Sequence, residues 1–288
     1  MIRIQSGALS AEINPFGAEL HRLRDADGRD LLWDGDPAFW TGRAPILFPV
    51  IGCVAGGEIR IDGKAYPMPK HGFARHKPFA VVAHSDDSAT FRLEPDAETR
   101  AAYPFAFRLD ICFGVAGGTL SIEAMLHNPG DAALPASFGF HPALRWPLPW
   151  GGLRADHRIR FDREEPAPIR RIDQAGLLRP QPEPTPVRGR DLALADSLFV
   201  DDALIFDRLG SRGLTYGAPG APSLRVSFPA MPLLGIWTKP GAGFLCIEPW
   251  QGIADPEGYG GEFRDKPGVI AVPPRSTHLF AVHIALVP

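Results

Sequence analysis

The sequence has few cysteines and no long apolar run, and each shortage excludes a class of protein. Cys53, Cys112 and Cys246 are the only cysteines among 288 residues. They form no Cys-x-x-Cys pair, which argues against a disulfide framework and a structural zinc site. No run of about 18 apolar residues could cross a membrane, and residues 1–20 lack the apolar core of a signal peptide. We therefore expect a cytoplasmic protein with no membrane contact.

Excess charge and helical periodicity are also missing. The chain has 30 Lys and Arg residues against 33 Asp and Glu residues, a formal net charge of -3, so nucleic acid is not an expected partner. No apolar stripe at 3.6-residue spacing continues over three turns, and only residues 96–102 and 193–197 are candidates for short helices. The 31 glycines and 31 prolines further argue against a helical bundle.

What the sequence does contain is alternation of apolar and polar residues, which is typical of half-buried β-strands. The clearest run covers residues 105–113, and the pattern resumes over residues 120–126 after Gly117-Gly118, which predicts a hairpin. Asp62-Gly63 predicts a second hairpin, and a turn at residues 85–88 predicts a third. Further strands are expected at residues 224–228, 234–237, 244–247 and 279–286.

The pattern as a whole predicts an all-β fold, a large antiparallel β-sandwich that forms a single domain over residues 1–288. No unit of roughly 20 to 50 residues repeats, which disfavours propellers and solenoids. Six prolines between residues 165 and 186 would suit an interdomain linker, but the apolar residues among them favour a long surface excursion of one domain.

Ionisable residues stand out at four places where the surrounding sequence is apolar or rich in glycine and proline. Nucleophile-elbow, Walker, dinucleotide-binding and H-E-x-x-H motifs are all missing from the chain, so we expect neither a cofactor nor a metal. The four places are, in chain order, Arg43 before an apolar run, His71 with Arg75, His141 between aromatic residues, and Glu248 at the end of an apolar run.

Each of these residues also has an ordinary structural explanation. A histidine beside aromatic residues is more often part of a core, and Arg43 could form an internal ion pair with Glu248. Glu248 argues most strongly for a function, because a carboxylate at the end of an apolar strand needs a partner or a chemical role. Two histidines, two arginines and a glutamate near a tryptophan suit a cleft for a neutral polyol such as a sugar.

At these residues the sequence resembles the aldose 1-epimerase (galactose mutarotase-like) family. The resemblance depends on the blocks RAPILFP, HGFAR, GFHP and CIEPW at residues 43–49, 71–75, 139–142 and 246–250. Residues 201–206 and Asp265-Lys266-Pro267-Gly268 add further family-like elements. The resemblance implies a single-domain β-supersandwich with a cleft on one sheet. It also implies interconversion of the α and β anomers of a free aldose without metal or nucleotide.

The resemblance also implies a role for individual residues. His141 matches the general acid, Glu248 the general base, and His71 a second active-site histidine that positions the sugar ring. The residues that fall where sugar-binding residues lie are Arg43, Arg75, Asp202 and Trp237. Asp201 is adjacent to Asp202, and only strand alternation would decide which of the two faces the cleft.

Several alternatives remain open at this point. The block around His141 lacks the Asn-His-Thr pattern of the galactose-preferring branch, so a galactose substrate is not implied. A hexose-6-phosphate epimerase would need extra cations at the rim, for which Arg75, His76 and Lys77 are candidates. A non-catalytic sugar-binding protein could share the fold, whereas a glycosidase is disfavoured because only one carboxylate is well placed by its context. The chain is expected to be a monomer or a homodimer.

Overall fold

Strands dominate the structure, a computed structural model that describes residues 1–288. The one α-helix, α1 (Ala97–Ala102), begins after Asp96, whose carboxylate accepts a hydrogen bond from the Thr99 N–H, so the helix predicted at residues 96–102 is confirmed. None of the helices is long and apolar enough to cross a membrane. The 3₁₀ helices are η1 (Ala55–Gly57), η2 (Ala74–His76), η3 (Arg154–Asp156), η4 (Asp196–Phe199) and η5 (Phe263–Asp265).

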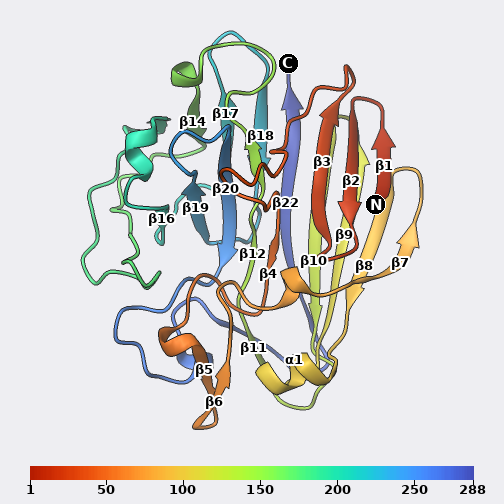
Figure 1. Cartoon of the computed structure of the whole chain (residues 1–288), viewed down its shortest axis with the longest axis vertical. Helices are drawn as coiled ribbons and strands as arrows, with labels where there is room; N and C mark the ends of the chain where they lie inside the picture. The colour runs from red at the N-terminus through yellow and green to blue at the C-terminus, as the bar shows by residue number, and fades with distance from the viewer.

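The largest sheet has nine strands, which pair in antiparallel fashion and form one layer of the molecule (Figure 1). The strand at one edge is short, and the strand at the other edge is exposed along its whole length. In spatial order the strands are β15 (Asp191–Ala193), β14 (Arg158–Phe161), β17 (Gly213–Gly217), β18 (Ser223–Ser227), β22 (Thr277–Val287), β10 (Thr119–His127), β9 (Arg108–Ala116), β8 (Ser88–Leu93) and β7 (Ala80–His84).

A six-stranded sheet and three small sheets complete the architecture. In the six-stranded sheet the order is β16 (Leu204–Phe206), β19 (Leu233–Trp237), β20 (Phe244–Gln251), β12 (Phe138–Phe140) and β4 (Ile46–Leu47), while β13 (Ala143–Arg145) also pairs with β20. The small sheets consist of β1 (Ile2–Ser6), β2 (Leu9–Asn14) and β3 (Glu19–Asp25); of β5 (Glu58–Ile61) and β6 (Lys64–Pro67); and of β11 (Leu134–Ala136) and β21 (Ile270–Val272).

The three predicted hairpins are confirmed. Strands β9 and β10 pair around Gly117 and Gly118, both of which have the positive φ that their turn requires. Asp62-Gly63 joins β5 to β6, and residues 85–88 join β7 to β8. The polar face of β9 is less exposed than its alternation predicts: Asp110 is only 5% exposed, because Arg92 forms two hydrogen bonds with its carboxylate.

The core lies between the layers, and the predicted antiparallel sandwich is confirmed. In Figure 1 the sheet β1–β3 lies over β8–β10, and the six-stranded sheet lies over the other half of the long sheet. Phe138 of β12 stacks on Phe280 of β22 with ring centroids 4.6 Å apart. The largest core cluster joins 65 buried residues from Ile4 to Ile284. We propose on this basis that the chain folds as one domain.

The proline-rich segment between residues 165 and 186 is not the simple surface excursion that the sequence predicts. An isolated antiparallel bridge between Ile172 and Leu178 folds the segment back on itself, and Leu178 is buried. Ile172 and Gly176 line a cavity of about 270 Å³. The apolar residues among the prolines therefore build a wall of that cavity.

Candidate active site

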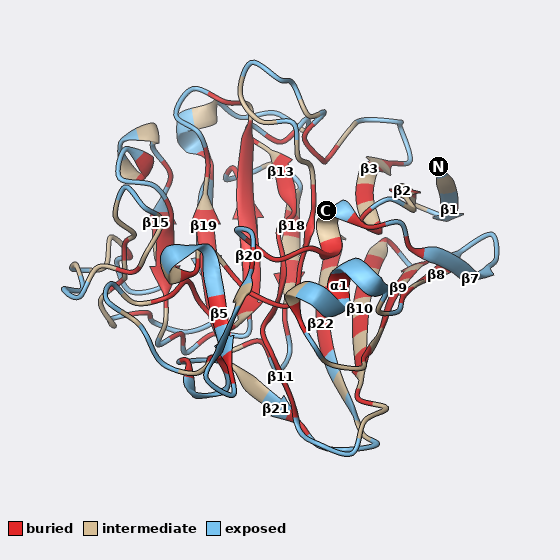
Figure 2. Ribbon diagram, turned by 60° about the horizontal axis from the view of Figure 1, so that its bottom comes forward, coloured by how far each residue is buried: buried red, intermediate tan, exposed pale blue.

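Strand β20 carries the carboxylate that the sequence singles out. Every residue of this strand except Gln251 is buried, and Figure 2 shows the strand as buried along nearly its whole length. Because side chains alternate across a strand, Cys246, Glu248 and Trp250 share one face. Glu248 is only 2% exposed. The strand therefore places a carboxylate inside the protein, in the middle of the six-stranded sheet.

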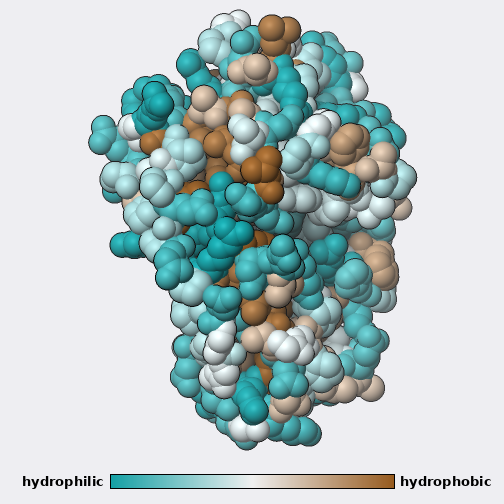
Figure 3. Space-filling view, turned by 60° about the vertical axis from the view of Figure 1, so that its left-hand side comes forward, coloured by the Kyte–Doolittle hydropathy of each residue, from teal (hydrophilic) through white to brown (hydrophobic).

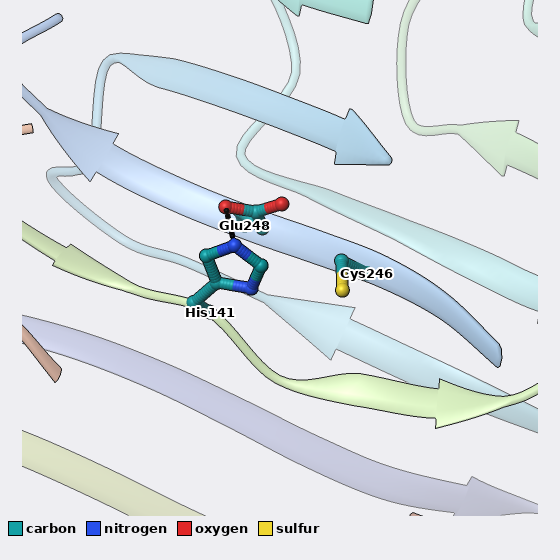
Figure 4. Close-up of side chains that lie close together, drawn as sticks. All are labelled: His141, Cys246 and Glu248. Carbon is teal, nitrogen blue, oxygen red and sulfur yellow. Dashed lines mark ion pairs between the residues drawn. The ribbon is translucent and has the colours of Figure 1, made fainter. Parts of the chain in front are cut away.

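His141 reaches Glu248 because the chain is interrupted between β12 and β13. Both short strands pair with β20, one on each side of the position opposite Glu248, so the residues between them lie beside the carboxylate. His141 Nε2 lies 3.1 Å from Glu248 Oε2. Figure 4 shows the two side chains pointing toward each other. The residues predicted as general acid and general base thus meet, although their numbers differ by more than one hundred.

Polar atoms of this pair remain free for a ligand. Neither His141 Nδ1 nor Glu248 Oε2 makes a hydrogen bond. The contact between His141 Nε2 and Glu248 Oε2 is close, but it is not an aligned hydrogen bond. The Trp40 ring lies over the His141 ring with centroids 4.9 Å apart and restricts its orientation. Buried polar atoms without partners are costly in a folded protein, which suggests that a bound molecule completes them.

His71 lies next to this pair in an unusual backbone conformation. Its φ is 66°, in the left-handed region that few non-glycine residues adopt. Its Nδ1 accepts a hydrogen bond from the Gly52 N–H at 3.1 Å, so a neutral ring carries its proton on Nε2. The rings of His71 and His141 are 5.8 Å apart and nearly perpendicular. His71 thus offers one fixed donor beside the acid–base pair.

These side chains line a cavity of about 270 Å³, a volume suited to a small ligand. Figure 3 shows one face of the protein, on which much of the apolar surface lies in a recessed band between hydrophilic margins. The cavity combines indole rings with charged groups, a mixture that suits the C–H faces and hydroxyl groups of a sugar. Its lining residues are Trp40, Ile51, Gly52, Lys70, His71, Arg75, His141, Ile172, Gly176, Asp202, Ala203, Ile205, Trp237, Glu248, Trp250 and Ala254.

The predicted binding residues Arg75, Asp202 and Trp237 lie in this lining together with the acid–base pair and His71. Asp202 lines the cavity and the adjacent Asp201 does not, so the turn there presents only the second aspartate. Asp202 has a φ of 68°, the same left-handed conformation as His71. Such backbone strain is concentrated at functional sites in proteins. The roles of these residues stay predictions.

Arg43 is the exception, and its placement in the sugar site is wrong. Its guanidinium donates to the His21 carbonyl oxygen at 3.1 Å, and its side chain lies outside the cavity lining. The backbone N–H of Arg43 is held by the Glu19 carboxylate at 2.8 Å. The alternative of an internal ion pair with Glu248 is wrong as well, because the basic side chain next to Glu248 is His141.

Among the lining residues that were not predicted as site residues, three have aromatic or charged side chains: Trp40, Lys70 and Trp250. Trp250 ends the CIEPW block that contains Glu248, and its alternation with Glu248 places it on the same face. Lys70 directly precedes His71, which is the only sequence signal for it. Trp40 has no such signal, because it reaches His141 from an irregular loop that is distant from His141 in the sequence.

Burial sets the charge of the central pair. Loss of solvent raises the pKa of Glu248 well above its ordinary value, and the nearby Asp202 charge raises it further. Loss of solvent lowers the pKa of His141 to about 3, and the Arg75 charge contributes to the same shift. The pKa of His71 also falls well below its ordinary value because of burial. These opposite shifts favour a state in which the Glu248–His141 pair holds one proton, which is shared between a carboxyl and an imidazole.

His141, Cys246 and Glu248 are also the group whose ligand atoms come close enough to suggest a metal site, since these atoms lie within 4.8 Å of one another. Cys246 lies on β20 beside the pair in Figure 4, but it does not line the cavity. Burial raises the pKa of its thiol well above the ordinary value, which disfavours the thiolate that binds metals. The donor set thus does not fit a metal well, and no step proposed below uses one.

Two glycines make room for the Trp250 indole, which predicts the effect of a substitution. A Cβ added at Gly235 would lie 2.4 Å from the indole ring. We expect Gly235→Ala to lower the free energy of unfolding by about 1–3 kcal/mol, as overpacking usually does. Gly114→Ala on β9 is the matched control, because a Cβ there meets no atom within 4 Å. Equal stability of the two variants in urea unfolding would contradict this packing argument.

Comparisons with known proteins first define the structural class. A galactose mutarotase-like protein from Lactobacillus casei superposes over 100% of both chains with a TM-score of 0.91 and 29% sequence identity. A galactose mutarotase related enzyme from Lactobacillus acidophilus gives a TM-score of 0.88 at 27% identity, over 99% of this chain and 97% of that one. The fold is therefore the galactose mutarotase-like β-sandwich.

Sequence comparison then identifies the family. The sequence model of the aldose 1-epimerase family matches residues 1–258, and the chain belongs to this family. Protein LacX, chromosomal, of Lactococcus lactis subsp. lactis is 32% identical over 292 residues, which cover 96% of each chain. The resemblance drawn from the sequence blocks is thus confirmed at the level of the family.

Proposed function

We propose that this protein is an aldose 1-epimerase, an isomerase that interconverts the α and β anomers of a free aldose. The observation that carries the proposal is the buried pair of Glu248 and His141, with 3.1 Å between carboxylate oxygen and imidazole nitrogen at a cavity of about 270 Å³. A cytoplasmic location and a monomeric or dimeric state stay predictions.

The pair suits the chemistry of anomer exchange. One group removes the proton from the C1 hydroxyl while the other protonates the ring oxygen, and the bond between C1 and the ring oxygen breaks to give the open-chain aldehyde. Rotation about C1–C2 and reclosure, with the two proton transfers reversed, give the other anomer with no net change in protons. Both reacting oxygens are bonded to C1 and lie very close together, so the acid and the base must also be adjacent. A Glu248–His141 pair that holds one proton provides one acid and one base.

The surrounding residues would hold the ring in place. The Nε2–H of His71 is available as a donor because its Nδ1 is occupied by the Gly52 N–H. The indole rings of Trp40 and Trp237 meet at 86° and offer apolar faces to the C–H groups of a sugar. Asp202 and Arg75 can bind hydroxyl groups further from the reacting carbon.

Polarimetry of freshly dissolved α-aldoses tests the proposal. We expect the purified protein to accelerate the decay of optical rotation for at least one free aldose, in proportion to its concentration. A non-catalytic sugar-binding protein would instead quench tryptophan fluorescence saturably on sugar addition and leave the decay of rotation unchanged. Sugar binding without faster decay of rotation would exclude epimerase activity.

The rate is expected to depend on pH through the shared proton. Because burial lowers the pKa of His141 to about 3 and raises that of Glu248, the one-proton state prevails between these two limits. The value of kcat/KM should fall below about pH 3 and again above the raised pKa of Glu248. Polarimetry, corrected for the uncatalysed rate at each pH, would measure this profile. A single step near pH 6.5, the ordinary histidine value, would contradict it.

A hexose 6-phosphate is the second candidate substrate, and one observation favours it. Lys70 and Arg75 both line the cavity, and neither forms an ion pair with a carboxylate. Of the three cations suggested by the sequence, Arg75 lines the cavity, whereas His76 and Lys77 do not. Lys77 is buried and pairs with Asp96 at 3.0 Å.

Exchange NMR on glucose and glucose 6-phosphate separates the two substrate classes. If phosphate is recognised, kcat/KM for the phosphorylated sugar should exceed that for the free sugar, and Lys70→Met should remove this difference. Equal or better use of the free sugar would exclude the phosphorylated substrate class.

A further inference from the structure

We propose that the buried ion pair of Asp255 and Lys266 is a positioning device for His71. The inference rests on the proposed function for its kinetic consequences, but its structural part can be measured without the reaction. Neither side chain lines the cavity at the candidate active site, and both border a separate cavity of about 70 Å³. The pair also gives a role to the Asp265-Lys266-Pro267-Gly268 element, which the reaction itself leaves unused.

The ion pair is the most deeply buried one in the protein. Lys266 Nζ lies 2.6 Å from Asp255 Oδ1, and the two side chains are 1% and 6% exposed. Burying two charges in this way is rarely the most stable solution for a core, because both lose their hydration. Such a pair is retained more readily where it fixes one particular geometry. The question is therefore what geometry Asp255 fixes.

Asp255 clamps the chain that follows Gly52. Its Oδ2 accepts the Ala55 N–H at 2.8 Å, and its backbone N–H donates to the Cys53 carbonyl oxygen at 2.9 Å. One residue therefore binds both ends of the segment 53–55, once through its side chain and once through its backbone. The ion pair with Lys266 holds the carboxylate of this clamp in place.

The clamped segment in turn holds His71. The Gly52 N–H donates to His71 Nδ1 at 3.1 Å, and the His71 N–H donates to the Gly52 carbonyl oxygen at 2.9 Å. Gly52 itself packs against Ala254, the neighbour of Asp255, so closely that an added Cβ would lie 2.5 Å from the Ala254 side chain. A continuous series of short contacts therefore runs from Lys266 through Asp255 and Gly52 to the imidazole ring.

His71 needs such support because its conformation is unfavourable by itself. The φ of 66° is disfavoured for a residue with a Cβ, and it persists only where neighbouring contacts enforce it. The bond from the Gly52 N–H also decides which ring nitrogen carries the proton. If segment 53–55 moves, His71 loses both its backbone conformation and the donor that faces the cavity.

Two double variants separate this role from simple stability. Single substitutions would leave one buried charge unpaired and destabilise the protein, so both charges are removed together. Asp255→Asn with Lys266→Met removes both charges but keeps a side-chain oxygen for the Ala55 N–H. Asp255→Ala with Lys266→Met removes both charges and that oxygen. The two proteins have equal charge and differ in the side-chain amide at position 255, which supplies the bond to Ala55.

The direct readout is the tautomer of His71 in the free protein. In 15N-histidine NMR spectra, with the His71 signals assigned by their loss in His71→Gln, wild-type protein should show the proton on Nε2. The Asn double variant should keep this pattern, and the Ala double variant should lose it. With an aldose substrate, kcat/KM should fall about 10- to 100-fold in the Ala double variant and less than threefold in the Asn double variant.

Two further proteins keep the test decisive. Ala55→Pro removes the N–H that Asp255 accepts and leaves the ion pair intact, and Val54 has the extended backbone that precedes proline readily (φ -110°, ψ 144°). It should perturb His71 as the Ala double variant does, even if that variant fails to fold. Glu165→Ala is the matched control, because Glu165 is a buried carboxylate that accepts the Gly210 and Ser211 N–H groups away from His71.

The outcomes distinguish this proposal from the proposed function. A wild-type His71 tautomer in both Ala55→Pro and the Ala double variant would overturn the positioning role, whatever the rates are. The same tautomer change in Glu165→Ala would also overturn it, because the effect would then be general destabilisation. The last case is a tautomer that changes in Ala55→Pro and the Ala double variant but not in Glu165→Ala, while the wild-type protein accelerates no anomer exchange. This result would overturn the proposed epimerase activity and support the positioning role.

Discussion

Replacing Glu248 by Gln is expected to lower kcat for anomer exchange about 100-fold or more. The amide keeps the size and shape of the side chain and can still lie beside His141, but it neither accepts nor releases a proton at the reacting oxygens. Substrate binding should change little, because most of the cavity lining is untouched, so KM is expected to remain within about threefold of the wild-type value. Polarimetric progress curves over a range of sugar concentrations give both constants.

Stability provides an independent reading of the same variant. Burial raises the pKa of Glu248 in the folded protein above the value of 4.5 that an exposed glutamate has. Above that value the unfolded chain releases this proton more readily than the folded one, so the residue contributes less stability as the pH rises. Gln carries no charge, and the gain in Tm of Glu248→Gln over wild type should therefore be larger at about pH 8 than at about pH 4.

Glu123→Gln is the matched control for both measurements, since Glu123 lies on β10 of the nine-stranded sheet, outside the cavity lining. It should leave kcat unchanged and show no such dependence of the Tm difference on pH. Near-normal turnover in Glu248→Gln, with Glu123→Gln also normal, would remove Glu248 from the chemistry.

The hairpins could be predicted because the residues that determine them are neighbours in the sequence. Gly117-Gly118 and Asp62-Gly63 supply the positive φ that their turns need, and alternating residues on either side fix the register. The order of strands in the two large sheets has no such local signal. Strand β20 lies between β19 and β12, and only the second of these neighbours is distant in sequence. Its position depends on packing over the whole chain.

The candidate site shows the same division. Glu248 could be identified because a carboxylate in an apolar strand conflicts with its surroundings, and that conflict is visible in the sequence. Arg43 has a similar context, yet its guanidinium is taken up by the His21 carbonyl oxygen. A backbone acceptor of this kind leaves no trace in the pattern of residue types. For the same reason Lys77 suggested a rim cation, although its buried side chain forms an ion pair with Asp96.

His141→Asn is the second substitution with a large expected effect, again a loss of about 100-fold or more in kcat. The environment of His141 differs from that of a buried histidine such as His157, whose Nε2 accepts the Leu148 N–H at 3.0 Å. The nitrogen atoms of His141 have no comparable backbone partner, since Nδ1 is free and Nε2 faces only the carboxylate. Asn cannot exchange a proton with the ring oxygen, and Glu248 is left without its partner.

The two substitutions should not act independently. If Glu248 and His141 work as one pair that holds a single proton, removing either group removes the acid–base function of both. The double variant should then be no more than about tenfold slower than the slower single variant, whereas independent groups would lose about 10⁴-fold in total. His157→Asn is the control, which should lower Tm and leave kcat of the folded fraction unchanged. Multiplicative losses in the double variant would mean that the two side chains act at separate steps, because a shared proton cannot be lost twice.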